Sequence, residues 1–277
     1  NRVVSNSIRG PGQSYGITIS DGDGNVITNN PAISGQGGAG IYMTGYASSN
    51  RIVGNVIASN VSWGIHLDSA TALANEVGRN RLHTGGVSLF VFGGAGNIFF
   101  NNVSYNNAGG ARIDPGASVS NAFYNNIFMS NSSPGITNGG AGTLWEYNDV
   151  FGHVQNYRNT NLFASFTANI SADPLFSNIA ARNFRLRGPT PMSPAVDAGT
   201  TNSSGVGLTR YDATPVAGYF RDMGAYEASF TNDAVTNDYY VDDAFNAGDL
   251  YTPGAVGSDT NDGKTSLSPK RTLTNLL

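Results

Sequence analysis

The sequence contains no cysteine, few charged residues and no long apolar run. Without cysteine there is no disulfide framework, so cysteine usage gives no information about the compartment. Charged residues make up 12% of the 277 positions and the net charge is −4, which argues against the basic patch that a nucleic-acid partner needs. No apolar stretch reaches the ~18 residues of a membrane-spanning helix. We therefore expect neither a nucleic-acid partner nor a membrane span.

No amino-terminal signal peptide is recognisable. Because a strand-like pattern is already under way at Asn1, we expect any export signal to precede this segment. Lysine occurs only at positions 264 and 270, and histidine only at positions 66, 83 and 153. Glycine and asparagine are abundant instead, with 36 and 33 residues. Both tolerate positive φ angles, so the chain is expected to turn often and tightly.

A repeat of about two dozen residues runs through the first 150 positions. One series places an asparagine after a short apolar run, and its asparagines lie 21–26 residues apart at positions 6, 29, 55, 80, 101, 125 and 148. The segments GITIS, GIYMT, GIHLD, GVSLF and GARID form a second series, whose glycines stand at positions 16, 40, 64, 86 and 110. Two series with nearly the same period indicate one repeating structural unit.

The repeated segments are predicted to be β-strands. They are four to six residues long, rich in valine, isoleucine and phenylalanine, and bounded by glycine, asparagine or serine. A unit of this size cannot bury its own apolar face, so the units must stack at the ~4.8 Å spacing of paired strands. The sequence therefore predicts an all-β chain that forms a parallel β-solenoid with coils of about 21–26 residues. The asparagines are expected at tight bends in the left-handed conformation, with stacked side chains that bond to neighbouring coils.

This pattern resembles the right-handed parallel β-helix family over residues 1 to about 150. Four later segments, DPLF (173–176), NFRLR (183–187), SPAVDAG (193–199) and RDMGAYE (221–227), resemble the closing region of many extracellular bacterial β-helix proteins. The resemblance implies a right-handed helix and an extracellular or cell-surface location. Prolines in this region exclude a central helix, so we expect last coils with larger turns.

A change of composition after Glu227 predicts a domain boundary. We expect a β-helix module over residues 1–227, a polar linker over residues 228–238 and the opening segment of a following β-helix module over residues 239–277. The last segment has the order strand, turn-rich loop and helix start, which resembles the beginning of such a module. The chain is thus predicted to belong to a longer tandem protein, in which neighbouring copies or modules cover the open ends of the solenoid.

Alternation along the glycine series predicts two outward rows on one face of the solenoid. The first expected row is Thr18, Tyr42, His66, Ser88 and Arg112, and the second is Ser20, Thr44, Asp68, Phe90 and Asp114. The positions expected inside are Ile17, Ile19, Ile41, Met43, Ile65, Leu67, Val87, Leu89 and Ile113. Neighbours within a row lie ~4.8 Å apart, so Tyr42 and His66 can touch.

Enzymes that remove the proton α to a uronate carboxyl group need a base, an acid and a cation. His66 is the candidate base, Tyr42 the candidate acid and Arg112 the candidate neutraliser of the carboxylate, with Asp68 beside them. This set resembles that of alginate-type epimerases and lyases, although residues 1–263 offer no lysine base and the chain has no D-P-H motif. Phe90 and Asp114 are candidate ligand-binding residues, with Phe90 as a stacking platform for a sugar. A solvated face without function explains the same outward polar residues.

The segment DGDGN places Asp21, Asp23 and Asn25 at alternate positions, like the opening of a calcium-binding loop. An EF-hand is excluded, because the glycine at the sixth position and the glutamate at the twelfth are missing. A turn-bound Ca²⁺ is the remaining metal prediction, and an ordinary Asp/Gly turn is the alternative.

Two functions stay open at the level of sequence. One is a structural or adhesive surface module of a long extracellular repeat protein, with acidic polysaccharide as a further partner. The other is a polysaccharide lyase or epimerase acting on uronate-containing polymers. The start of a second module, the low charge and the scarcity of lysine favour the first function.

Overall fold

The computed structural model describes residues 1–115, 118–188, 191–200, 202–203, 206–207, 220–228 and 256–261, with Pro269 and Arg271. The chain divides into two compact units, residues 1–231 and 232–277. All but residue 228 of the predicted linker and most of the predicted second module lie outside the described residues, so both stay predictions. In the described part of the chain, no helix is long and apolar enough to cross a membrane.

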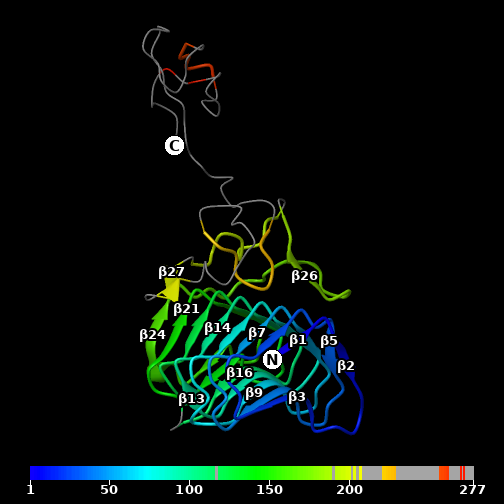
Figure 1. The fold of residues 1–277 in the computed structure, drawn as a ribbon. Helices are drawn as coiled ribbons and strands as arrows, with labels where there is room; N and C mark the ends of the chain where they lie inside the picture. Colours follow the sequence, from blue (N-terminus) through cyan, green and yellow to red (C-terminus); the bar gives the residue numbers. More distant parts are fainter. Residues whose placement is uncertain are drawn as a thin grey trace. The chain divides into compact units, whose positions relative to one another are not determined.

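Three parallel sheets form a solenoid, in which each of seven coils adds one strand to each sheet and β24 adds an eighth strand to the first sheet (Figure 1). Sheet 1 comprises, in spatial order, β1 (Arg2–Val4), β4 (Val26–Thr28), β7 (Arg51–Val53), β10 (Glu76–Gly78), β14 (Ile98–Phe100), β18 (Ala122–Tyr124), β21 (Thr143–Glu146) and β24 (Phe163–Thr167). Sheet 2 comprises β2 (Ser7–Arg9), β5 (Ala32–Ser34), β8 (Val56–Ala58), β11 (Arg81–His83), β15 (Val103–Tyr105), β19 (Ile127–Met129) and β22 (Asp149–Phe151). Sheet 3 comprises β3 (Tyr15–Ser20), β6 (Ala39–Thr44), β9 (Trp63–Leu67), β12 (Val87–Val91), β16 (Gly109–Ile113), β20 (Ile136–Asn138) and β23 (Tyr157–Arg158).

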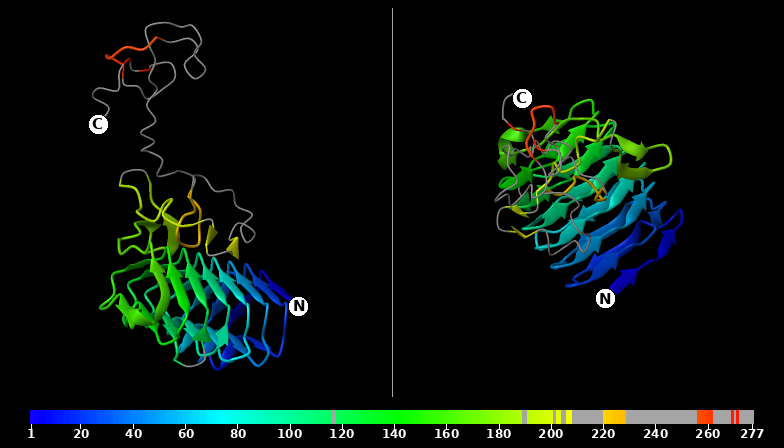
Figure 2. Two further views of the ribbon diagram at one scale, coloured as in Figure 1. Left: turned by 90° about the vertical axis from the view of Figure 1, so that its left-hand side faces the viewer. Right: turned by 90° about the horizontal axis from the view of Figure 1, so that it is seen from above.

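The coils are stacked in register, so that equivalent residues follow one another along the solenoid axis (Figure 2). Two short extra strands, β13 (Gly94–Ala95) and β17 (Ser118–Val119), pair in the connection from sheet 3 back to sheet 1. A 3₁₀ turn, η1 (Thr160–Leu162), precedes β24. The predicted all-β parallel solenoid is confirmed.

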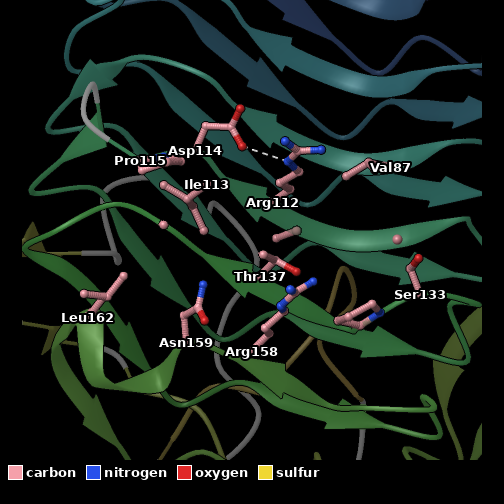
Figure 3. A pocket seen from close by; sticks show the side chains of 14 residues that line it. Val87, Arg112, Ile113, Asp114, Pro115, Ser133, Thr137, Arg158, Asn159 and Leu162 are labelled. Carbon is pink, nitrogen blue, oxygen red and sulfur yellow. Dashed lines mark hydrogen bonds and ion pairs between the residues drawn. The ribbon is translucent and has the colours of Figure 1, made fainter.

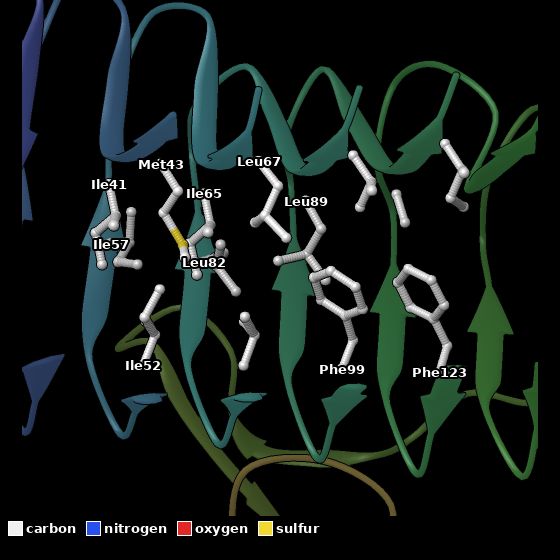
Figure 4. Packing of buried hydrophobic residues seen from close by; sticks show 14 of the residues in the cluster. Ile41, Met43, Ile52, Ile57, Ile65, Leu67, Leu82, Leu89, Phe99 and Phe123 are labelled. Carbon is white, nitrogen blue, oxygen red and sulfur yellow. The ribbon is translucent and has the colours of Figure 1, made fainter. Parts of the chain in front are cut away.

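Inside the solenoid, the coil that introduces the first inward aromatic ring of sheet 1 has smaller inward residues in its other two sheets. In sheet 1 the inward column changes from aliphatic to aromatic at Phe99, whose ring stacks on Phe123 with centroids 4.4 Å apart (Figure 4). The coil that contributes Phe99 has small inward residues in its other two sheets, Ser104 and Ala111, where the coil before it has Leu82 and Leu89. The large ring therefore fills the volume that the smaller side chains leave.

Two ladders of asparagine side chains, buried except at their ends, hold the coils together. One lies between sheets 1 and 2 and consists of Asn6, Asn30, Asn55, Asn80, Asn102, Asn126, Asn148 and Asn169. At a typical rung, the Oδ1 atom of Asn80 accepts from the backbone and side-chain nitrogens of Asn55, each at 3.0 Å. The Nδ2 atom of Asn80 donates to the carbonyl of Ile52 at 2.9 Å and to Asn102 at 3.0 Å. The second ladder precedes sheet 1 and consists of Asn1, Asn25, Asn50, Asn75, Asn97 and Asn121.

Each predicted asparagine does only one of the two things expected of it, so the prediction that one residue both occupies the bend and stacks is wrong. Asn29, Asn101 and Asn125 occupy the left-handed bend as predicted, whereas the stacking residues are Asn6, Asn55, Asn80 and Asn148. The left-handed residue directly precedes the ladder residue, as in Asn29 with φ 52° before Asn30. Asn101 and Asn125 likewise occupy the bend, with φ 51° and 56°. A side chain at the bend points outward, whereas the next residue points inward, where its amide can satisfy buried backbone groups.

After the last coil, the chain folds back along the outside of the solenoid. β25 (Phe176–Asn178) and β26 (Asn183–Leu186) form an antiparallel hairpin. The ring of Phe184 lies 5.9 Å from those of His83 and Tyr105, centroid to centroid. The side chains of this returning segment build a second core over Val103 and Ile127 on the outer face of sheet 2, and they include Phe176, Phe184, Leu186, Val196 and Met223.

The expectation that this region forms last coils with larger turns is therefore wrong. Bend residues tie the returning segment down: Asn125 exchanges hydrogen bonds with the backbone of Thr200, and Asn101 donates to the carbonyls of Asp222 and Gly224. The physical reason lies on the outer face of the sheets, where apolar residues such as Val103 and Ile127 need a cover that another coil cannot supply.

One carboxyl group is buried where the returning chain leaves the solenoid. The side chain of Asp149 is shielded from solvent, and its Oδ1 atom accepts from the backbone of Ala172 at 3.2 Å. Its Oδ2 atom has no hydrogen-bond partner among the described residues. Burial, reinforced by the charge of Asp173, raises the pKa of Asp149 from 3.8 to about 7.

Replacing a ladder asparagine will destabilise the solenoid far more than replacing a bend asparagine. Asn80→Ala leaves several buried backbone groups unpaired, so we expect a loss of about 2–4 kcal/mol in the free energy of unfolding. Asn29→Gly keeps the left-handed bend and loses only an exposed amide, so its effect should stay within ~0.5 kcal/mol. Urea denaturation of both variants measures the difference, and equal midpoints would contradict the role assigned to the ladder.

Stability will fall with rising pH because of Asp149. The folded state binds the proton of this carboxyl more tightly than the unfolded state does, so its stabilising effect is complete below pH 3.8 and is lost as the pH rises through about 7. Asp149→Asn should remove this part of the dependence and raise stability at pH 8. Asp222, whose pKa burial raises to about 6, keeps its own contribution in both proteins. Denaturation midpoints at pH 4, 6 and 8 that shift in parallel for both proteins would contradict this.

Candidate functional site

The outer face of sheet 3 carries the predicted site residues in a line parallel to the solenoid axis. In register, the partners follow in the order Thr18, Tyr42, His66, Phe90, Arg112, Thr137 and Arg158, here called the central row. Beside it runs a flanking row of Tyr15, Ala39, Trp63, Val87 and Gly109. Tyr42 and His66 are neighbours as expected, and Arg112 is two rungs beyond His66.

The predicted positions of Val87, Ser88 and Phe90 are wrong by two residues. In the segment GVSLF, the register places Ser88 and not Gly86 at the level of Gly64. The hydroxyl of Ser88 points into the core, 2.6 Å from that of Ser104. Phe90 consequently joins the central row next to His66, and Val87 is half-buried outside the core. Backbone pairing sets this register, and a serine is small enough to take the place of a glycine.

A strip of aromatic rings follows from this register, and we call it the aromatic strip. Its members are Tyr15, Tyr42, Trp63, His66, Phe90 and Phe92. Tyr15 stacks on Tyr42 with centroids 4.2 Å apart and ring planes 6° apart. The ring of His66 packs against both Trp63 and Phe90, at 4.4 Å and 4.6 Å, and these two rings also stack on each other with centroids 5.5 Å apart. Tyr15, Tyr42 and Trp63 are half-buried and Phe92 is 49% exposed, so the strip presents ring surface to solvent.

Sequence reasoning missed Tyr15 and Trp63. Each stands directly before a glycine of the repeat, Gly16 and Gly64, and this spacing was the available signal. Phe92 was missed because the sequence analysis assigned its place to Phe90. This place lies in the second predicted row, together with Asp68 and Asp114. Backbone hydrogen bonds from Asp68, Phe92 and Asp114 to equivalent carbonyls of the preceding coils, at 2.8–2.9 Å, fix that row.

Asp68 links the two residues predicted to act as acid and base. The hydroxyl of Tyr42 donates to Oδ2 of Asp68, and Nε2 of His66 lies 3.6 Å from Oδ1. Burial, helped by the hydrogen bond to Asp68, raises the pKa of Tyr42 to about 12. Burial lowers the pKa of His66, against the opposing charges of Asp68 and Asp114. His66 is only 5% exposed, and neither ring nitrogen has a hydrogen-bond partner among the described residues.

Beyond Phe90 the central row changes from aromatic to charged. The guanidinium of Arg112 lies over the ring of Phe90, 5.1 Å from its centroid. Its Nε atom donates to Oδ1 of Asp114 at 2.7 Å. A pocket of about 520 Å³ opens next to this pair, where Gly109 contributes no side chain to the flanking row. Arg112, Thr137 and Arg158 line it along the central row, with Pro115, Asn159 and Leu162 around them (Figure 3).

The DGDGN segment is built into the coil contacts. Oδ1 of Asp21 accepts from the backbone of Tyr46 at 2.9 Å, and Oδ1 of Asp23 accepts from that of Ser48 at 2.8 Å. Asn25 is a rung of the second ladder. These contacts match the ordinary Asp/Gly turn, and across the described residues no three acidic or histidine side chains group closely enough to hold a metal ion. Calcium at Asp21, Asp23 and Asn25 stays a prediction.

The face combines two chemical surfaces along one axis. Half-exposed rings can lie against the apolar C–H face of a pyranose ring, as they do against other flat apolar surfaces. The hydroxyl of Thr137 and the guanidinium groups of Arg112 and Arg158 can donate to hydroxyl or anionic oxygens. Proton abstraction by His66 would require its shielded nitrogens to reach a substrate.

Comparisons with known proteins agree with this architecture. A family model described as the right handed beta helix region matches residues 1–161, more than half of the chain. No curated protein and no solved structure shows significant similarity to the chain. The matched range contains sheets 2 and 3, sheet 1 except its last strand β24, and both asparagine ladders except the last rung Asn169, together with every residue of the aromatic strip. The chain therefore belongs to the right-handed β-helix family.

Proposed function

We propose that this chain is an extracellular or cell-surface module that binds carbohydrate, and that the aromatic strip of sheet 3 is its binding surface. The observation that supports this proposal most directly is the pair of half-buried flanking rings, Tyr15 and Trp63. Each rests against an aromatic ring of the central row, Tyr42 in one case and Phe90 in the other. Such rings lose little conformational entropy when a ligand covers them, because stacking already fixes their orientation.

The spacing of the strip supports a chain-like ligand. Rings in successive coils are separated by the ~4.8 Å between paired strands, and the line continues over several coils. A polymer laid along the solenoid axis would therefore meet a ring or a polar side chain at each step. An extended ligand of repeating units fits this surface better than a compact metabolite, which calls for a deep enclosed pocket.

Binding is better supported than catalysis on the same face. A general base must reach the proton that it removes, whereas His66 is covered by Trp63 and Phe90. A general acid must release its proton, whereas the pKa of Tyr42 is raised to about 12 and its proton is engaged by Asp68. These contacts favour an adhesive module over the lyase or epimerase alternative.

Trp63 is predicted to be a main contact for the ligand. Trp63→Ala should weaken binding to a responsive oligosaccharide roughly tenfold or more, as expected for a central aromatic contact, while Trp63→Phe should retain most of it. Isothermal titration calorimetry measures both. Urea denaturation of the same variants serves as the control for folding, and unchanged affinity of a folded Trp63→Ala protein would contradict the proposed surface.

The chain provides its own spectroscopic control. Its only other tryptophan is Trp145, which is fully buried in the core. Ligand binding should change the fluorescence of the wild-type protein and leave that of Trp63→Phe, which retains only Trp145, unchanged. A response of equal size in the two proteins would place the ligand elsewhere.

Turnover of uronate polymers tests the catalytic alternative. We expect the wild-type protein to bind without forming unsaturated or epimerised uronate, because the nitrogens of His66 are shielded. Product analysis by NMR after long incubation checks this. Turnover by the wild-type protein that His66→Gln abolishes would support the lyase or epimerase function instead.

A further inference from the structure

The arginine-lined pocket continues the aromatic strip at its carboxyl-terminal end. Phe90, Arg112, Thr137 and Arg158 are successive partners in register, so Arg158 lies three rungs beyond Phe90, roughly 14 Å along the axis. The cation–π contact between Arg112 and Phe90 joins the two surfaces without a gap. A chain bound over the rings would therefore pass directly into this pocket.

The charges in the pocket are not balanced. Asp114 is its only lining carboxylate, and this group is committed to Arg112 at 2.7 Å. Arg158 is exposed, and no carboxylate of the described residues lies within ion-pair distance of it. The other carboxylate of this face is Asp68. It lies two coils before the coil of Arg112 and accepts a hydrogen bond from Tyr42. Among the described residues, the positive charge of Arg158 is therefore not balanced at the pocket end of the face.

The remaining polar groups complete a site for an anion. Thr137 stands between the two arginines in the central row and offers a hydroxyl donor, and Asn159 offers an amide. In Figure 3 the side chains of Arg112, Thr137 and Arg158 follow one another along the pocket. Arginine can bind a carboxylate or a sulfate group through two parallel hydrogen bonds, which fixes the position of the anion as well as its charge.

From this arrangement we infer that the carbohydrate bound by the aromatic strip is acidic, and that Arg158 binds its anionic group. The inference rests on the proposed carbohydrate-binding function and specifies the class of sugar. The shared chemistry is a carboxylate or sulfate ester on a sugar ring, held in the pocket between Arg112 and Arg158. The rings supply the part of the affinity that does not depend on charge, and Arg158 supplies the selection for charge.

The test compares sugars that differ only at C6. Hexasaccharides of β-1,4-glucose, β-1,4-mannose and α-1,4-galactose are titrated beside their C6-carboxylate and 6-O-sulfated forms. The variants are Arg158→Gln and Arg9→Gln, which remove the same charge from exposed positions on sheets 3 and 2. We expect the wild-type protein to prefer an anionic form about tenfold over its neutral partner, as one charge-assisted pair allows. Arg158→Gln should lose this preference, and Arg9→Gln should keep it.

The outcomes separate the inference from the function on which it rests. Equal affinity of wild-type protein for neutral and anionic forms overturns the inference and leaves carbohydrate binding intact. The same is true if Arg158→Gln weakens neutral and anionic forms equally, or if Arg9→Gln abolishes the preference as well. Absence of binding to every sugar overturns both. The preference should also shrink when the salt concentration rises from 0.05 to 0.5 M, as roughly expected for a solvent-accessible charge.

Discussion

The register between neighbouring coils is the constraint on which the rest of this structure depends, and buried asparagine amides hold it. Each rung joins the backbone of one coil to the side chain of the next, as Asn55, Asn80 and Asn102 do between sheets 1 and 2. A slip of one residue would leave these amides unpaired in the interior and would turn the apolar residues of each strand outward. The cost of both errors together makes one register far more stable than its neighbours.

Because the register is fixed, the outer face of sheet 3 becomes an ordered array. Residues that are some 24 positions apart in sequence stand one strand spacing apart in space, so single residues in successive coils add up to a continuous surface. Tyr42, His66, Phe90 and Arg112 form such a line. The array needs no loop to position it, and a ligand that binds along it would find the side chains already oriented. The change from rings to arginines along the line gives that surface a direction.

The other faces are used differently. The returning segment covers the outer face of sheet 2 and forms hydrogen bonds with the bend residues Asn101 and Asn125. These contacts bury that face and stabilise the solenoid. The last part of this segment, residues 221–227, contains a buried ion pair, in which Nη1 of Arg221 lies 3.8 Å from Oε2 of Glu227. Within the described residues, the half-exposed rings of sheet 3 have no such cover, and this difference between the faces supports assigning ligand binding to sheet 3.

The sequence alone determined the repeat length, the strands of the two repeated series and most of the core residues of sheet 3, because alternation within a strand and recurrence about every two dozen residues can both be read along the chain. Ile41, Ile65 and Leu67 are inside as predicted. Only the tertiary structure decided that Ser88 replaces a glycine, that Phe90 and Trp63 pack against His66, and that Phe184 lies over Tyr105. Those contacts depend on pairing between segments far apart in the chain, where backbone hydrogen bonds and the packing of whole faces select among registers that local patterns leave equally allowed.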